Sequence, residues 1–172
     1  RQRGLSPIAS PPARGTPAIP HSNQAGVRWH MLGHLQRNKA KKAVDLCRLV
    51  HSMDSLRLAE EIQAAGLKFD RVIDVLIQVN SSGEESKFGC APAAAPRLAE
   101  EIMTMANVRI RGLMTMAPHS ENPERARGTF ARTRELFEEM LKSGIAGPPS
   151  AFNILSMGMS GDYEVAISEG AN

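Results

Sequence analysis

The chain has 172 residues, 42% of them hydrophobic, so it is long enough to bury the core of one domain. No apolar run approaches the length that crosses a bilayer, which excludes a membrane-spanning class of protein. The formal net charge of +3 is modest, and the two cysteines form no Cys-x-x-Cys pair. This cysteine usage favours a reducing, cytoplasmic location over a disulfide scaffold.

The charge is distributed unevenly along the chain. Eight lysines and arginines precede Asp45, which is the first acidic residue. Such asymmetry is typical of nucleic-acid-binding arms and of targeting peptides. The basic stretch has neither interleaved aromatic residues nor a regular amphipathic helix, so we expect a solvated tail and no nucleic-acid partner.

Residues 1–27 differ in composition from the remainder. They contain five prolines and three glycines, and proline prevents both helices and sheets from propagating. We therefore predict a disordered or non-homologous segment at 1–27 and a folded domain at 28–172. The first residue is not methionine, which indicates a fragment, a processed product or a misjoined reading frame.

From residue 28 onward, short apolar strands alternate with amphipathic helices. The predicted strands cover residues 29–35, 49–53, 72–80, 108–116 and 152–159. The first predicted helix follows Lys39 and ends near Arg48, the second runs from Asp54 to Gly66, and the third covers residues 97–106. The fourth runs from Asn122 to Gly144, and a last short helix begins at Asp162. Strands and helices that alternate five times predict parallel strands joined by right-handed crossovers.

Capping residues set the predicted helix ends. Asp54 and Asp162 are expected to cap helix N-termini, and Asn122 followed by proline marks a third start. Gly66 and Gly144 are expected to end the helices that precede them.

An α/β barrel is favoured over an open doubly wound sheet. No Gly-x-Gly-x-x-Gly loop follows the first strand, and no Walker motif occurs, so the common nucleotide-binding sheets are disfavoured. In such barrels the chemistry lies at the carboxyl ends of the strands. The strand-to-helix junctions are therefore the places to look for a site.

The junction at 156–162 (SMGMSGD) is the most informative of these. Its two glycines allow a ligand to approach the backbone, and its two serines can donate hydrogen bonds. The junction opens at a helix N-terminus, which favours an anion. From the residues alone, an anion site and an ordinary turn capped by Asp162 remain equally open.

Two other groups of polar residues favour structural roles. Loop 80–89 is typical of a solvated loop, and Lys87 is flanked by acidic residues, which argues against a lysine of lowered pKa that forms Schiff bases. His30 and His34 share one strand face, but no third metal ligand is evident. We predict that His30 points into the barrel and forms a hydrogen bond there, and that no metal is bound.

Five segments, taken in order, resemble successive signatures of the pyridoxal phosphate homeostasis proteins (the proline synthetase co-transcribed family). They are WHMLGHLQRNKAK (29–41), HSMDSLRLA (51–59), VLIQVNSSGEESKFG (75–89), IRGLMTMAP (110–118) and LSMGMSGDYEVAISEGA (155–171). The resemblance implies a (β/α)8 TIM-type barrel similar to the alanine racemase N-terminal domain. It also implies pyridoxal 5′-phosphate as the small-molecule partner, held as a Schiff base, in a protein without established turnover.

Site residues follow from the same resemblance. The phosphate-binding turn would contain Ser156, Met157, Gly158, Met159 and Ser160. Four residues at other strand ends would line the cofactor cavity: His30, Gly33, Asn80 and Met114.

The chain also departs from the family pattern. The Val-Ser-Lys segment with the Schiff-base lysine, the Gly-Glu-Asn segment and the final Val-Arg-hydrophobic-Gly strand do not occur in it. We therefore expect an incomplete barrel with strands three to seven of eight, whose cofactor binding is weakened and whose stability is low. The first alternative is a cofactor-free interaction fragment, and the second, which is less favoured, is an amino-acid racemase. The oligomeric state stays open.

Overall fold

A computed structural model describes residues 27–84 and 86–172, in which five parallel strands form one sheet in the order β1-β2-β3-β4-β5. The strands are β1 (His30–Met31), β2 (Leu49–Met53), β3 (Ile73–Gln78), β4 (Val108–Met114) and β5 (Ile154–Ser156). The predicted alternation and the partial α/β barrel are confirmed.

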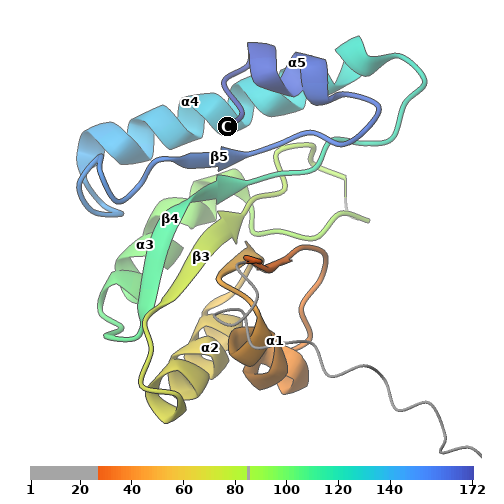
Figure 1. Cartoon of the computed structure of the whole chain (residues 1–172). Helices are drawn as coiled ribbons and strands as arrows, with labels where there is room; N and C mark the ends of the chain where they lie inside the picture. Colours follow the sequence, from red (N-terminus) through yellow and green to blue (C-terminus); the bar gives the residue numbers. More distant parts are fainter. Residues whose placement is uncertain (1–26, 85) are drawn as a thin grey trace, which may run out of the picture.

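Helices follow each strand and lie along the outside of the curved sheet (Figure 1). They are α1 (Ala40–Leu46), α2 (Leu56–Lys68), α3 (Ala95–Met103), α4 (Arg127–Ser143) and α5 (Tyr163–Ser168). Short 3-10 turns, η1 (Arg37–Lys39), η2 (Pro92–Ala94) and η3 (Pro123–Ala126), lead into α1, α3 and α4. No helix in the described part of the chain is long and apolar enough to span a membrane.

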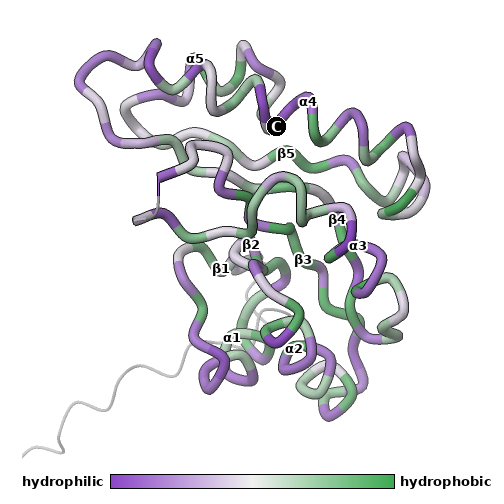
Figure 2. The backbone as a smooth tube through the Cα atoms, turned by 180° about the vertical axis from the view of Figure 1, so that it is seen from behind, coloured by the Kyte–Doolittle hydropathy of each residue, from purple (hydrophilic) through white to green (hydrophobic). Residues whose placement is uncertain are grey.

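The main core lies between the sheet and these helices. On β3, Val75 and Ile77 are buried in one large cluster with Ile62 of α2 and Ile102 of α3. Leu76, between them, belongs instead to a small cluster with Leu49 and Met114 on the inner face. Five of the six residues of β3 are buried, as expected for a strand covered on both faces, and its tube is mostly green in Figure 2.

The sheet is strongly curved. Two strands separate β2 from β5, so in a flat sheet these two strands would lie about 14 Å apart. Yet His51 of β2 hydrogen-bonds Ser156 of β5, with 2.9 Å between Nδ1 and Oγ. Inward-facing side chains therefore meet across the sheet, as in a barrel interior.

A glycine permits the close pairing of β4 with β5. A Cβ atom at Gly112 would lie 1.7 Å from the carbonyl oxygen of Ile154. Gly112 and Ile154 are partners in the ladder, so only a residue without a side chain fits this register.

Two predicted strands were too long. β1 covers only two residues of the predicted 29–35, because Gly33 turns the chain with φ +82°. β5 covers three residues of the predicted 152–159, and Gly158 bends the chain with φ +91°. In both places glycine adopts a left-handed conformation that ends the strand.

The helix ends were predicted with mixed success. Asn122 caps η3 by accepting from the Glu124 N–H, and Gly144 ends α4 in the left-handed conformation, both as predicted. Gly66 was wrongly predicted as a stop: it lies inside α2, where a Cβ would meet Asn107, and α2 continues to Lys68. Close packing rather than helix termination explains this glycine.

The two aspartate caps were also wrong in detail. Ser55 rather than Asp54 occupies the N-cap position of α2, and Asp54 lies 3.8 Å from Nδ1 of His34. Asp162 occupies the N-cap position of α5 without capping it, because its carboxylate accepts from the Met159 N–H instead.

One side chain covers the outer edge of β5. The Asn172 N–H donates to the Leu155 oxygen (3.2 Å), and the Leu155 N–H donates to Asn172 Oδ1 (2.9 Å). Asn172 Nδ2 also donates to the Asn153 oxygen (2.9 Å). The edge groups of residues 153–155 are therefore paired with a single asparagine.

Residues 1–26 lie outside the described residues, so the predicted disorder of the segment 1–27 and its boundary at Arg28 stay predictions.

Candidate functional site

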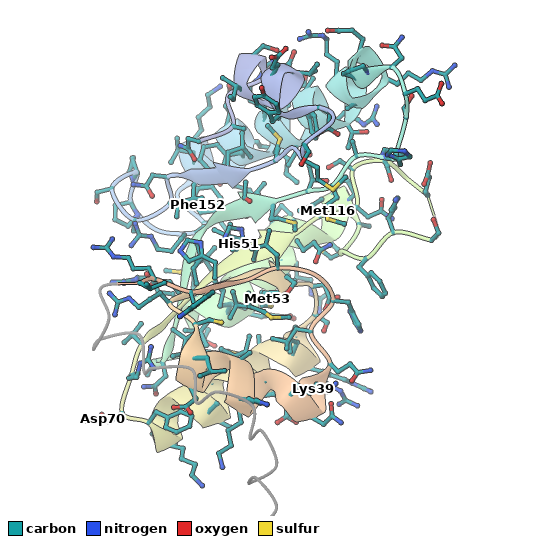
Figure 3. All side chains as sticks on the ribbon, turned by 45° about the vertical axis from the view of Figure 1, so that its right-hand side comes forward. Lys39, His51, Met53, Asp70, Met116 and Phe152 are labelled. Atoms are coloured by element: carbon teal, nitrogen blue, oxygen red, sulfur yellow. The ribbon has the colours of Figure 1, made fainter. Side chains whose placement is uncertain are left out.

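Three polar side chains form a chain of hydrogen bonds on the inner face of the sheet. Nδ1 of His30 on β1 lies 3.1 Å from Nε2 of His51 on β2, which is labelled in Figure 3. Nδ1 of His51 lies 2.9 Å from the hydroxyl of Ser156 on β5. The predicted inward hydrogen bond of His30 is confirmed, and its partner is a histidine that the sequence reasoning did not select.

The surroundings keep His51 uncharged. Burial, and to a smaller degree the neighbouring His30, lower the pKa of His51 to about 4. At neutral pH this imidazole therefore has one ring nitrogen that donates and one that accepts. The hydrogen bonds on its two sides are consequently not independent of each other.

A row across the inner face connects Ser156 to two other strands. Met114 is the ladder partner of both Gln78 and Ser156. Gln78 donates from Nε2 to the Phe88 oxygen (3.3 Å), and its buried Oε1 has no hydrogen-bond partner in the described part of the chain. The row thus contains a hydroxyl, a thioether and an unsatisfied acceptor.

Sequence alternation could have identified the missed residues. Leu49 and Leu76 face inward, so the residues two positions later, His51 and Gln78, face inward as well. The sequence motifs led to neither of these two residues as a site residue.

Asn80 and Gly33 serve the shape of their loops. The Asn80 amide donates to the Glu84 oxygen (2.8 Å) and its Oδ1 accepts from the Ser82 hydroxyl (2.8 Å), which organises the loop after β3. Gly33 is exposed and provides the turn after β1. Their predicted roles in a cofactor cavity remain predictions.

The turn after β5 requires a glycine. A Cβ at Gly158 would lie 2.7 Å from the Cβ of Ala166 and 3.0 Å from the Cα of Tyr163, both in or next to the first turns of α5. Met157 is half-buried between two apolar clusters, and Met159 is 43% exposed. The backbone of this turn is therefore held closely against α5 while its tip faces solvent.

The tip of the turn already contains an anionic group. Met159 N–H donates to Oδ1 of Asp162 at 2.6 Å. Ser160 is exposed, and a Cβ at Gly161 would have open space around it. An external anion at this tip would thus meet a free hydroxyl and an amide that a carboxylate occupies.

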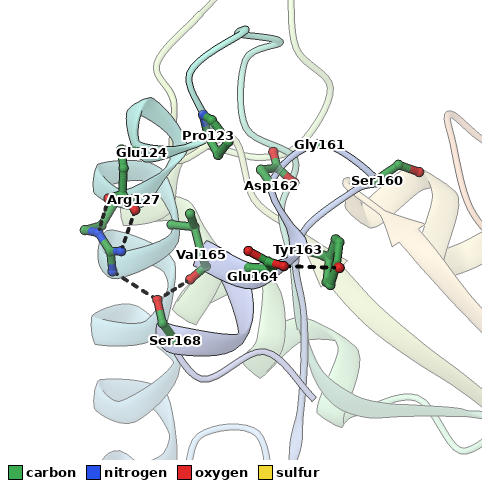
Figure 4. A pocket seen from close by; sticks show the side chains of 10 residues that line it. All are labelled: Pro123, Glu124, Arg127, Ser160, Gly161, Asp162, Tyr163, Glu164, Val165 and Ser168. Atoms are coloured by element: carbon green, nitrogen blue, oxygen red, sulfur yellow. Dashed lines mark hydrogen bonds and ion pairs between the residues drawn. The ribbon is translucent and has the colours of Figure 1, made fainter.

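Two cavities flank residues 160–162. One of about 250 Å³ is bounded by His119, Ser120 and Met159, and the other, of about 460 Å³, by Arg127 and Ser168 (Figure 4). Arg127 is neutralised by Glu124 and Glu169, each at 2.7 Å. The larger cavity therefore lacks a strong unpaired cation in its wall.

Lysines are absent from the strands that the structure describes. They lie in η1 and α1 (Lys39, Lys41, Lys42), in α2 (Lys68), in the loop after β3 (Lys87) and in α4 (Lys142). Within the described ranges, no group of three or more His, Cys, Asp or Glu side chains could hold a metal ion.

Comparison with known proteins places the chain among proteins of one fold. The alanine racemase N-terminal domain family matches residues 19–171. A pyridoxal phosphate homeostasis protein of Aquifex aeolicus is 45% identical over 145 residues, which are 84% of this chain and 62% of that protein. The chain thus spans less than two thirds of the length of this relative.

Two solved structures are similar as well. PipY of Synechococcus elongatus without pyridoxal phosphate superposes with a TM-score of 0.79 at 32% identity, over 88% of this chain and 69% of PipY. PipY with pyridoxal phosphate bound gives a TM-score of 0.75 at 31% identity, over 88% and 68% of the two chains. This chain therefore corresponds to a part of the longer PipY chain.

Proposed function

Because the chain belongs to the pyridoxal phosphate homeostasis protein family, we propose that it provides the phosphate-binding side of a pyridoxal 5′-phosphate site. The relative PipY has been solved with pyridoxal phosphate bound, which supports this ligand for the chain. The proposed role is to carry the cofactor in the cytoplasm rather than to turn over a substrate.

One observation carries this proposal: the Ser156 hydroxyl is fixed by His51 at the end of β5, directly before the glycine turn at 157–161. Ser156 and Ser160 would donate hydrogen bonds to the phosphate, and Gly158 lets the turn pack closely against α5. Met114, beside Ser156 in the sheet, would contact the cofactor along the inner face. The two hydroxyls suit a phosphate group, whereas the Met159 N–H becomes available to it only when the Asp162 carboxylate releases that N–H.

No lysine on the described strands is placed to react with the aldehyde end of the cofactor. Pyridoxal phosphate supplies an aldehyde that reacts with lysine amines, and the lysines of the described chain lie on helices and loops. Lys39 borders a separate apolar cavity beside α1 and Cys47. We therefore infer that these residues hold the cofactor through its phosphate, without a covalent bond.

Equilibrium titration tests the proposal. The chain should bind pyridoxal phosphate at least about tenfold more tightly than pyridoxal, since charge-assisted hydrogen bonds to the phosphate are lost in pyridoxal. Ser156→Ala should weaken pyridoxal phosphate by about fivefold to tenfold. Ser150→Ala, an exposed serine in the loop before β5, is the matched control and should bind normally.

Equal affinities for pyridoxal and pyridoxal phosphate, or normal binding by Ser156→Ala, would overturn the phosphate site. Borohydride reduction followed by mass spectrometry tests the absence of a covalent bond. A stoichiometric pyridoxyl group on Lys39, Lys87 or another single lysine would contradict it.

A further inference from the structure

We propose that His30, His51 and Ser156 form a relay with two proton arrangements, and that a phosphate group bound at Ser156 selects one of them. The inference rests on the proposed phosphate site and assigns His51 as a positioning residue for it. It starts from the two distances that join the three side chains, 3.1 Å and 2.9 Å.

Each of the two contacts needs one hydrogen. Both contacts of His51 are made by ring nitrogens, and a neutral imidazole has a hydrogen on only one of them. His51 must therefore donate on one side and accept on the other. The direction of the first hydrogen bond fixes the direction of the second.

In the first arrangement, the Ser156 hydroxyl donates to Nδ1 of His51. His51 then carries its hydrogen on Nε2 and donates to Nδ1 of His30, so that His30 also carries its hydrogen on Nε2. The only proton of Ser156 is used inside the protein. Ser156 then has no hydrogen to offer to a ligand.

In the second arrangement, every hydrogen bond is reversed. His30 donates from Nδ1 to Nε2 of His51, and His51 donates from Nδ1 to the Ser156 oxygen. The Ser156 proton is now free to point away from His51. In both arrangements the two histidines share the same tautomer.

A phosphate group distinguishes these arrangements because its oxygens only accept hydrogen bonds when it is fully ionised. Such a group at Ser156 requires the hydroxyl to donate outward, which only the second arrangement allows. Phosphate binding should therefore move the hydrogen of both histidines to Nδ1, although only Ser156 touches the ligand.

The positions of the two histidines suit this coupling. His51 is 8% exposed on the inner face, whereas His30 is exposed at the end of the relay. Water can therefore satisfy the free Nε2 of His30 in either tautomer, while His51 depends on its two protein partners.

Nitrogen NMR of the complete chain labelled with ¹⁵N-histidine tests the relay directly, because tautomers differ in their ring-nitrogen shifts. Addition of inorganic phosphate, and separately of pyridoxal phosphate, should bring both His30 and His51 to the Nδ1–H form. Phosphate that binds in a Ser156-dependent manner without changing these tautomers would overturn the relay and leave the phosphate site standing. Loss of all Ser156-dependent binding would overturn both.

Variants separate positioning from packing. In His51→Asn, the side-chain amide can replace the Nδ1 donor, so phosphate affinity should stay within about twofold while His30 no longer responds. In His51→Leu, Ser156 loses its donor and affinity should fall by about fivefold to tenfold. His34→Asn, off the relay beside Asp54, is the control and should match the unmodified chain. Equal losses in the asparagine and leucine variants would contradict the positioning role.

Discussion

The two faces of the sheet differ in what fills them. The outer face is covered by helices and packs into one continuous apolar cluster that draws residues from all five strands or the segments next to them. The inner face holds only a small cluster around Leu49, Leu76 and Met114, and beside it lie the relay and the ion pair of Asp74 with Arg109. Apolar burial is therefore concentrated on the outer face, while the hydrogen bonds of His51 lie on the inner face.

This division explains why one strand can serve both purposes. Adjacent residues of a strand point to opposite faces, so β3 presents Ile77 to the helices and Gln78 to the inner row. A substitution on one face should therefore leave the chemistry of the other face largely intact.

The largest loss of stability is expected at the backbone contact between β4 and β5. Gly112→Ala would place a Cβ 1.7 Å from the Ile154 oxygen, which is a backbone atom that cannot rotate away. β4 and β5 would have to separate, so the free energy of unfolding should fall by about 3 to 4 kcal/mol. Urea unfolding followed by circular dichroism measures this loss.

Gly128 in α4 supplies the control for that experiment. A Cβ there would lie 3.7 Å from the flexible Arg132 side chain, and Gly128 is the second residue of α4, where the backbone is already helical. Gly128→Ala should therefore leave the free energy of unfolding unchanged or raise it by up to about 0.5 kcal/mol. Similar losses in both variants would show that the β4–β5 contact is not the cause.

Two substitutions at neighbouring residues compare how much each face of the sheet contributes to the free energy of unfolding. Ile77 and Leu76 are both fully buried, but they point to the outer and inner clusters respectively. Ile77→Ala should cost about 3 kcal/mol, and Leu76→Ala about 2 kcal/mol, because the flexible Met114 and Met116 can fill the smaller inner cavity. Equal losses of unfolding free energy in urea would contradict a difference in stability between the two faces.

The smallest expected effect is a pH dependence on the inner face. His51 has a pKa of about 4 in the folded chain and about 6.5 when unfolded, so the unfolded chain binds more protons between these values. The full difference in pKa corresponds to about 3 kcal/mol, and screening by solvent reduces this contribution. Stability should therefore be full above pH 6.5 and should fall by roughly 2 kcal/mol as the pH decreases to 4. His51→Gln should reduce this slope, whereas an unchanged slope would assign it to carboxylates.

The sequence was sufficient for the order of elements and for the family, because β-branched runs, caps and five ordered motifs are local signals. It was insufficient where packing decides. Gly66 follows the sequence pattern of a helix stop, but its close contact with Asn107, in the loop before β4, is visible only in the fold. Likewise, the pairing of His51 with Ser156 joins residues 105 positions apart and depends on the curvature of the sheet.

The candidate site was predicted in part for the same reason. Motifs led to Ser156 and to the glycine turn, and Met114 lies beside Ser156 in the sheet. Asn80 was selected by its place after β3, yet its amide is engaged within its own loop. The position of a residue at a strand end can be predicted from the sequence. The direction of its side chain depends on hydrogen-bond partners that only the fold shows.

The asparagine that pairs with the outer edge of β5 has a consequence for any further strand at that edge. Unpaired strand edges recruit further strands and promote aggregation. At β5, the outward groups of residues 153–155 are already bonded to Asn172, so an incoming strand would first have to displace that side chain.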